Sequence, residues 1–380
     1  MGPPTGAGRT GGGEVSARRR PGWRTATAAV TVVLALVVAG VVSVRQQHGS
    51  RPTAGVASTR SPSRSATEPS DWFSPFTLQG FAAGTEGGRD GPVAEVTSLA
   101  DSGPGTLRAV LSQPGPSWVR FAVSGAIVLS SPVTVPSDVT IDGRGADVTL
   151  ENKGLEIDGV HDVIVENMKF TAIRGSTSDA ISVKNGARDV WIDHSDFSDG
   201  RDGLVDITYG ATDVTVSWCH FFNHDKVMLI SVLKGTGRMQ VTVHHNWFDH
   251  TNQRNPLVRD AYAHVFDNYV DGFTAYGMQA QHGGYLLAQD NVLQAQPGTG
   301  NTDGIRIADG KWGEGVVRAQ GDVLLDGATQ LERFAWLLHP VDYRYDLQPA
   351  GAALAHELTA FAGWRPYPAD TTSVPPLPLA

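Results

Sequence analysis

Four segments of one shape decide the fold: VIVENMKF (163–170), VWIDHSDF (190–197), VTVSWCHF (214–221) and VTVHHNWF (241–248). Each begins with β-branched or aromatic residues and ends on a phenylalanine, and the phenylalanines recur at intervals of 27, 24 and 27 in the sequence. Runs of this composition favour strands over helices. A fixed period of this size indicates a solenoid, in which every coil contributes short strands and stacks on the next coil.

A second register supports the same interpretation further along the chain. Asn246, Asn268 and Asn291 recur at intervals of 22 and 23, so we expect a ladder in which each side chain bonds the turn backbone of a neighbouring coil. The ends of a stack expose strand edges and need covers. Residues 105–111 and 350–358 are predicted to form the covering helices. The sequence therefore predicts an all-β fold, a parallel β-helix with short capping helices at its ends.

Composition and charge exclude several classes of protein. The chain of 380 residues can bury a large core, and its single cysteine, Cys219, allows neither an intrachain disulfide nor a cysteine-rich zinc site. Residues 1–70 carry nine arginines and two glutamates, so the rest of the chain holds a net charge of −16 within the overall −9. An acidic domain argues against nucleic acid as a partner, because phosphate binding relies on a basic face.

The N-terminal part of the chain, 1–70, is expected to lie outside the folded domain. Residues 25–44 are uncharged and follow a basic, disordered N-terminus (1–24), which is typical of a transmembrane signal-anchor or of a cleaved signal peptide. Both alternatives place the remaining chain outside the membrane, which is a partner only if 25–44 stays uncleaved. We expect a disordered linker over 45–70, the β-helix domain over 71–364 and a proline-rich tail over 365–380. No signal of oligomerisation is present, and we expect a monomer.

Three aspartates interrupt the apolar strands. Asp202 and Asp206 are four positions apart, so on a strand they point to the same side, and Asp179 begins the preceding strand one coil earlier. Neighbouring carboxylates repel one another unless a cation neutralises them. Oxygen ligands without histidine or cysteine favour calcium over zinc. One such aspartate alone is more often a turn cap or a solvated side chain, but the three together indicate a Ca²⁺ site.

A group of basic residues lies on the following coils and consists of Lys226, Arg254 and Arg259. Arginine binds carboxylates in a bidentate manner and lysine offers a point charge, so the group could hold an anionic polymer against the stack. The alternative is an ion-pair network with neighbouring acids such as Asp225 and Asp260. A bound cation beside arginine and lysine favours the acidic ligand.

The order of the motifs resembles that of the secreted pectate lyases. The resemblance runs from about Gly80 to about Gly363. The motifs that carry it are GGRDG (87–91), GPGTLR (103–108), TIDGRG (140–145), WIDH (191–194), DGLVD (202–206), VTVSW (214–218), HDK (224–226), RNPLVR (254–259) and AHVF (263–266).

This resemblance implies a right-handed parallel β-helix and an extracellular, Ca²⁺-dependent enzyme. Its substrate would be an acidic polysaccharide, α-1,4-polygalacturonate or pectin, cleaved by β-elimination to 4,5-unsaturated oligogalacturonides. The three aspartates would bind Ca²⁺, Arg254 would abstract the C5 proton, and Lys226 and Arg259 would bind substrate carboxylates. Because a guanidinium is ordinarily always protonated, Lys226 is the alternative base.

Several alternatives stay open. A pectin lyase acting on methyl-esterified chains needs no calcium carboxylates, which the aspartates argue against. A glycoside hydrolase needs paired carboxylates around the scissile bond and would leave Arg254 without a purpose. A non-catalytic adhesin or polysaccharide-binding protein would be expected to lack Arg254. The chain also departs from the family pattern: Thr177 replaces a further calcium-binding acid of some relatives, and Asp267 and Asp290 stand where relatives often have asparagine.

Overall fold

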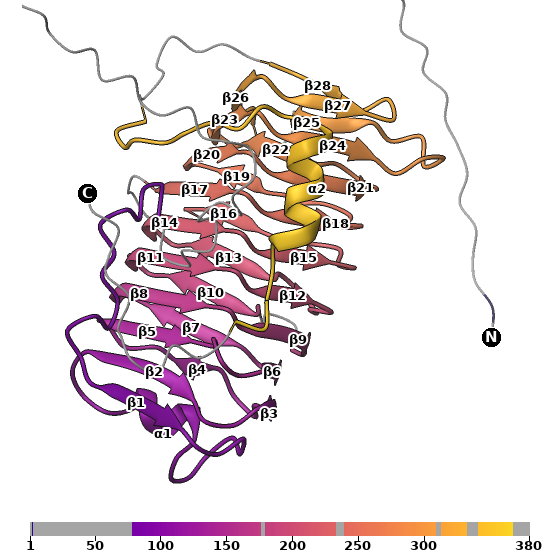
Figure 1. Ribbon diagram of the computed structural model, residues 1–380. Helices are drawn as coiled ribbons and strands as arrows, with labels where there is room; N and C mark the ends of the chain where they lie inside the picture. The colour runs from indigo at the N-terminus through magenta and orange to yellow at the C-terminus, as the bar shows by residue number, and fades with distance from the viewer. Residues whose placement is uncertain are drawn as a thin grey trace, which may run out of the picture. The chain divides into compact units, whose positions relative to one another are not determined.

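In the part of the chain that the structure describes, the backbone winds through three parallel sheets of ten, nine and nine strands, and each coil contributes one strand to each sheet (Figure 1). The computed structural model describes Gly2 and residues 78–175, 179–232, 239–308, 313–332 and 341–367. All of these except Gly2 belong to the second of two units, Pro69–Ala380. The predicted right-handed parallel β-helix is confirmed.

The strands are grouped into sheets I, II and III in the order in which a coil visits them. Sheet I contains β1 (Val93–Val96), β2 (Ser117–Phe121), β5 (Val139–Asp142), β8 (His161–Glu166), β11 (Arg188–Asp193), β14 (Thr212–Ser217), β17 (Gln240–His244), β20 (Tyr262–Phe266), β23 (Tyr285–Gln289) and β26 (Val316–Gln320). Sheet II contains β3 (Gly125–Val128), β6 (Val148–Asn152), β9 (Lys169–Ile173), β12 (Asp196–Ser198), β15 (His220–Phe222), β18 (Trp247–Asp249), β21 (Tyr269–Phe273), β24 (Val292–Ala295) and β27 (Val323–Leu325). Sheet III contains β4 (Val133–Thr134), β7 (Leu155–Asp158), β10 (Ile181–Lys184), β13 (Val205–Thr208), β16 (Leu229–Ser231), β19 (Leu257–Arg259), β22 (Met278–Gln281), β25 (Asp303–Ile307) and β28 (Thr329–Gln330).

The repeating phenylalanines form a stack inside the solenoid. Phe170, Phe197, Phe221 and Phe248 lie on neighbouring strands of sheet II, and their ring centroids are 4.9, 5.0 and 5.1 Å apart. These spacings are close to the roughly 4.7–4.9 Å between hydrogen-bonded strands, so each coil sets one ring on the ring of the coil before. All four side chains are buried. The spacing of phenylalanine in the sequence is thus the length of one coil.

The predicted asparagine ladder is present and fully buried. The Oδ1 of Asn268 accepts from the backbone N–H of Asn246 at 2.9 Å, and the Oδ1 of Asn291 accepts from that of Asn268 at 3.0 Å. Asp322 continues the series by accepting from the N–H of Asn291 at 2.9 Å, and Cys219 precedes it by donating to Asn246. The ladder satisfies backbone N–H groups at the corner between sheets I and II, where the strands end and the regular hydrogen bonds between the strands of neighbouring coils are interrupted.

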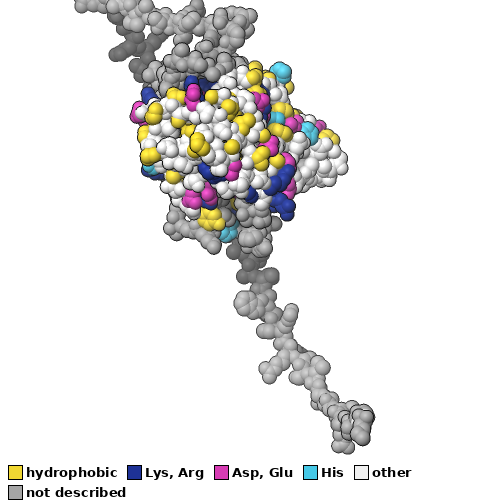
Figure 2. Space-filling model, turned by 90° about the horizontal axis from the view of Figure 1, so that it is seen from below, with side chains coloured by type: hydrophobic (Ala, Val, Ile, Leu, Met, Phe, Trp, Pro, Cys, Tyr) yellow, Lys and Arg dark blue, Asp and Glu magenta, His cyan; other side chains and the backbone are white. Residues whose placement is uncertain are grey.

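The N-terminal end of the stack is covered as predicted. Helix α1 (Leu107–Leu111) starts at Thr106, whose Oγ1 accepts from the N–H of Ala109 at 3.2 Å. Its two buried leucines belong to the same core as the strands. Seen from this end, the surface mixes hydrophobic side chains with acidic, basic and polar ones (Figure 2).

Helix α2 (Ala352–Phe361) lies along the side of the stack, although the sequence suggested a cover for its last coil (Figure 1). Leu354 and Leu358 pack on Tyr269 and Val292, which belong to successive coils. After the helix, the chain continues towards the earlier coils, and the N–H of Arg365 donates to the Oδ1 of Asn167 at 2.9 Å. The helix docks here because the turns of successive coils offer an apolar side that its two leucines can cover.

The predicted segments 1–24, 25–44 and 45–70 lie outside the described residues, as does Thr177. Within the described residues, no helix is both long and apolar enough to cross a membrane.

Candidate functional site

The residues predicted to be functional lie on, or shortly before, neighbouring strands of sheet III. Asp179 lies shortly before β10, Asp206 lies on β13, Lys226 precedes β16 and Arg254 precedes β19, which ends at Arg259. These four strands are consecutive neighbours in the sheet. Asp179 and Arg254, which are distant in the sequence, are thereby brought within three strand positions of each other.

Asp179 and Asp206 face one another across Gly203. The N–H of Gly203 donates to Asp179 Oδ1 at 3.0 Å, and the N–H of Leu229 donates to Asp206 Oδ1 at 3.0 Å. A Cβ atom on Gly203 would lie 2.5 Å from Asp206 Oδ1 and 2.8 Å from Asp179 Oδ1. The absence of a side chain at this position therefore keeps a small space open between two carboxylates.

Both carboxyl groups are held where a negative charge is costly. Burial raises the pKa of Asp179 to about 6, and the charge of Asp202 adds to the effect. Burial, and then the charge of Asp179, raise the pKa of Asp206 well above its usual range. The positive charge of Arg254 opposes both shifts. A buried carboxylate and a partly buried one beside a small open space form a set of donors that suits a hard divalent cation.

Asp202 has a different environment from the other two aspartates. It lies in the turn before β13 and not on the strand, so the expectation that its spacing aligns it with Asp206 on one strand is wrong. Its Oδ1 lies 3.4 Å from Lys226 Nζ, and both side chains are about one-third exposed. Its backbone carbonyl is 2.8 Å from His224 Nε2. Asp202 thus borders the carboxylate pair from the solvent side.

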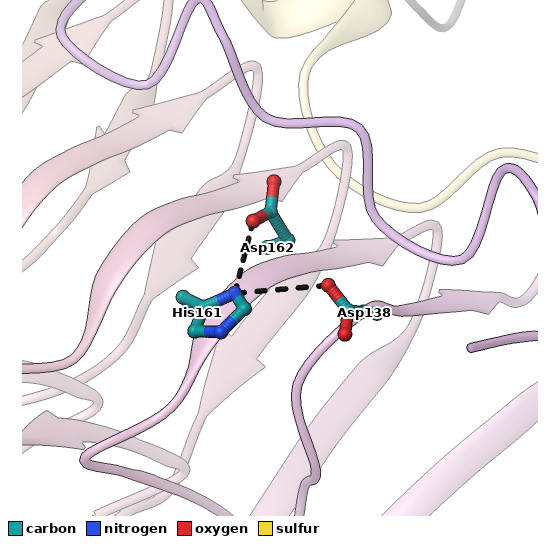
Figure 3. A group of neighbouring side chains, drawn as sticks. All are labelled: Asp138, His161 and Asp162. Carbon is teal, nitrogen blue, oxygen red and sulfur yellow. Dashed lines mark hydrogen bonds and ion pairs between the residues drawn. The ribbon is translucent and has the colours of Figure 1, made fainter. Parts of the chain in front are cut away.

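Two other groups of described residues bring three potential metal ligands within 4.8 Å of one another, which the three predicted aspartates do not. In one group, His161 Nδ1 lies 3.0 Å from Asp162 Oδ2 and 3.6 Å from Asp138 Oδ1 (Figure 3). The other group consists of Asp249, His250 and Asp271. In each, the histidine already pairs with a carboxylate, so we interpret both groups as ion pairs at turns.

Arg254 occupies the centre of the basic group. Its backbone has a φ of 63° and its carbonyl accepts from the N–H of Met228 at 2.8 Å. Its Nε is buried and, among the described residues, has no hydrogen-bond partner. Burial, and then the charge of Arg254, lower the pKa of Arg259. The two arginines are therefore close enough to repel, which favours an anion between or beside them.

Residues to which the sequence analysis gave no role in binding or catalysis extend the site on both sides. An open hollow of about 500 Å³ adjoins Asp202 and is lined by residues that include Arg201, His224, Asp225 and Asn252. On the other side, Tyr276 precedes β22 and lies near Arg254, one coil later in the chain. Tyr276 could therefore have been predicted from the sequence, because it follows Arg254 by the length of one coil.

Comparisons with known proteins agree on one family. The family model described as pectate lyase matches residues 126–366. Pectate lyase 1 of Ambrosia artemisiifolia is 32% identical over 291 residues, which cover 67% of this chain and 71% of that protein. The probable pectate lyase P56 of Solanum lycopersicum is 30% identical over 325 residues, covering 75% and 80%.

Solved structures show the same fold. The crystal structure of Jun a 1, the major allergen from cedar pollen, superimposes with a TM-score of 0.67 at 28% identity, over 76% of this chain and 93% of that chain. The pectate lyase Bsp165PelA from Bacillus sp. N165, solved in complex with trigalacturonate, has a TM-score of 0.61 at 23% identity, over 76% and 98%.

Proposed function

The chain belongs to the pectate lyase family and is a polysaccharide lyase, and from this premise we propose that it cleaves α-1,4-polygalacturonate by Ca²⁺-dependent β-elimination outside the cell. The products would be 4,5-unsaturated oligogalacturonides. The observation that carries the proposal is that the partly buried Asp179 and the buried Asp206 lie beside Gly203 and within electrostatic reach of Arg254, where a bound cation would offset their negative charge.

Asp179, Asp202 and Asp206 would hold the calcium ion. The space beside Gly203, the buried carboxyl group of Asp206 and the partly buried one of Asp179 fit such an ion. Bound Ca²⁺ would supply positive charge beside the uronate carboxylate, which favours negative charge developing at C5.

Arg254 would act as the base. It takes the proton from C5, the electron pair left on C5 forms the C4=C5 double bond, and the bond between C4 and the glycosidic oxygen breaks. That oxygen leaves with the electrons of the broken bond and takes up a proton from the solvent, and Arg254 then returns the C5 proton to the solvent, so no water is consumed. Arg254 is favoured over Lys226 because Lys226 is paired with Asp202, whereas the Nε of Arg254 is buried without a described partner. Lys226 and Arg259 would bind the carboxylates of the substrate.

The test follows the ultraviolet absorbance of the C4=C5 product on polygalacturonate, with Ca²⁺ and then with a chelator. We expect a signal that chelator stops and Ca²⁺ restores. Arg254→Ala should lower kcat by about 10²–10⁴-fold, the usual contribution of a general base. Arg318→Ala, a change in β26 of sheet I, is the matched control and should leave the rate unchanged. Retention of near-normal activity by Arg254→Ala would show that another group removes the proton.

Two alternatives are separated in the same assay. Activity on methyl-esterified pectin alone would indicate a pectin lyase, and binding of either polymer without product would indicate a non-catalytic binding protein. For location, we propose that residues 25–44 export the domain, either as an uncleaved anchor or as a cleaved signal. N-terminal sequencing of the mature protein distinguishes these two forms.

A further inference from the structure

The outer face of sheet III carries a second arginine two strands beyond the proposed catalytic site. In the strand register, Arg259 of β19 pairs with Gln281 of β22, and Gln279 of β22 pairs with Arg306 of β25. Successive residues of a strand point to opposite faces. The neighbours Met278, Ala280 and Ile305 are buried in the core, so the glutamines and both arginines lie on the outer face.

Arg306 is held in a defined position by its neighbours. Its guanidinium carbon lies 4.0 Å from the centre of the Tyr276 ring, and its Nε donates to Gln279 Oε1. Its Nη1 donates to Asp303 Oδ2 at 3.1 Å. The supporting Tyr276 and Gln279 are only 3% and 4% exposed, whereas the side chain of Arg306 is 30% exposed. The guanidinium of Arg306 is therefore held in position, and the side chain is still accessible to a ligand from solvent.

Positive charge is in excess around this position. The hydroxyl of Tyr276 is within electrostatic reach of Arg254, Arg306 and Arg259. Burial raises the pKa of Tyr276 to about 12, so its hydroxyl stays neutral and does not offset them. The carboxylate that pairs with Arg306 belongs to Asp303, which is 45% exposed. An exposed pair of this kind contributes little free energy, so a carboxylate from a ligand can compete for the guanidinium.

We propose that Arg306, resting on Tyr276, binds the carboxylate of a galacturonate unit further along the polymer than the unit bound by Arg259. This inference rests on the proposed function and deepens it. β25 lies two strand positions from β19, or roughly 10 Å along the stack, so only a substrate long enough to extend from the scissile bond to β25 gains the contact. Arg306 is thus a specificity-determining residue for long, de-esterified chains. A purely structural Arg306 would act on short and long substrates alike.

The test compares kcat and KM on trigalacturonate and on polygalacturonate for the full-length protein and two variants. Arg306→Gln removes the charge and keeps a polar side chain of moderate length. Arg306→Lys keeps the charge but lacks the paired N–H donors with which a guanidinium binds a carboxylate. For Arg306→Gln we expect a rise in KM of about 5- to 10-fold on polygalacturonate, with kcat and both constants on trigalacturonate within about twofold of the parent. Arg306→Lys should be intermediate. Arg318→Ala again serves as the control.

A second measurement separates this inference from the proposed reaction. In an Arg254→Ala background, Arg306→Gln should weaken the binding of polygalacturonate by the same factor, whether or not the parent has lyase activity. Equal losses on both substrates, a fall in kcat alone, or unchanged binding of the polymer would each overturn the proposal. A parent without lyase activity that binds the polymer through Arg306 would overturn the proposed reaction only.

Discussion

Asp267 offers a test of how the stack tolerates a buried acid. Its side chain is fully buried in the turn after β20, and its backbone is left-handed with a φ of 52°. Oδ2 accepts from the N–H of Gln348 at 3.0 Å, and Oδ1 has no described partner. Burial, together with nearby acids such as Asp290, raises the pKa of Asp267 from 3.8 to about 8. The folded protein therefore keeps a proton here that the unfolded chain releases.

This extra proton determines how the free energy of unfolding changes with pH. Below pH 3.8 both states are protonated and the group adds no pH dependence. Between pH 3.8 and about 8 the folded state holds the extra proton, so the free energy of unfolding falls as the pH rises, by about 1.4 kcal/mol per pH unit. From pH 5 to pH 8 the loss is about 4 kcal/mol. Asp267→Asn carries no titrating proton and also tolerates the left-handed backbone, so it should remove this loss.

The assay is equilibrium unfolding by denaturant at pH 4.5 and at pH 8.5. We expect Asp267→Asn to resemble the parent at the lower pH and to be more stable by several kcal/mol at the higher pH. Asp199→Asn is the matched control, because Asp199 is also left-handed, with a φ of 47°, but its side chain is 59% exposed. Stabilisation of equal size at both pH values would refute the argument, and so would destabilisation at pH 8.5.

Two further changes test the metal site and the core. Gly203→Ala would place a Cβ 2.5 Å from Asp206 Oδ1 and 2.8 Å from Asp179 Oδ1, so we expect at least about tenfold weaker Ca²⁺ activation, since about 1.4 kcal/mol of strain is enough for that factor. A Ca²⁺ titration of the lyase rate measures it, and an unchanged midpoint would exclude Gly203 from the ion's surroundings. Phe221→Ala removes a ring stacked between two others and should lower the free energy of unfolding by about 3–5 kcal/mol. Denaturant unfolding measures this loss, and a loss below about 1 kcal/mol would show that the stack collapses to fill the space.

Periodic features could be predicted from the sequence because each repeats once per coil. A phenylalanine or asparagine that returns after one coil length returns to the same position in the next coil, where it meets its counterpart. The stacked Phe197 and Phe221 and the bonded Asn246 and Asn268 follow directly from that spacing. The predicted acids and bases lie on, or shortly before, neighbouring strands of sheet III for the same reason.

Features that break the period could not be predicted in this way. The contact between Asn167 and Arg365 joins positions far apart in the sequence and depends on which side of the stack is apolar, so no spacing reveals where α2 docks. Alternation along a strand misplaces Asp202 because the strand begins only at Val205. Arg306 was missed because its importance depends on the Tyr276 ring beneath it.

The solenoid arranges the charged residues of sheet III in order along the direction in which its coils stack. Acids lie on β13 and just before β10, Lys226 precedes β16, and the arginines lie at β19 and β25. The change from acidic to basic therefore runs across the strands, along the direction in which coils stack. A polyanion lying along that direction would meet the aspartates proposed to bind Ca²⁺ first and guanidinium groups next.

The backbone of Arg254 adopts a conformation that is unfavourable for an arginine. A φ of 63° is unusual for arginine and costs roughly 1–2 kcal/mol. The hydrogen bond from Met228 to its carbonyl, and the one from Asn255 to the carbonyl of Gly277, fix the turn from the coils on either side. Neighbouring coils thus hold in place a backbone conformation that the residue would not adopt alone. Left-handed residues also occur at other turns of the stack, such as Tyr209 and Trp218, but among the described residues Arg254 is the only arginine with a positive φ. This conformation fixes the direction in which the side chain of Arg254 leaves the turn, as the proposed role of a base requires.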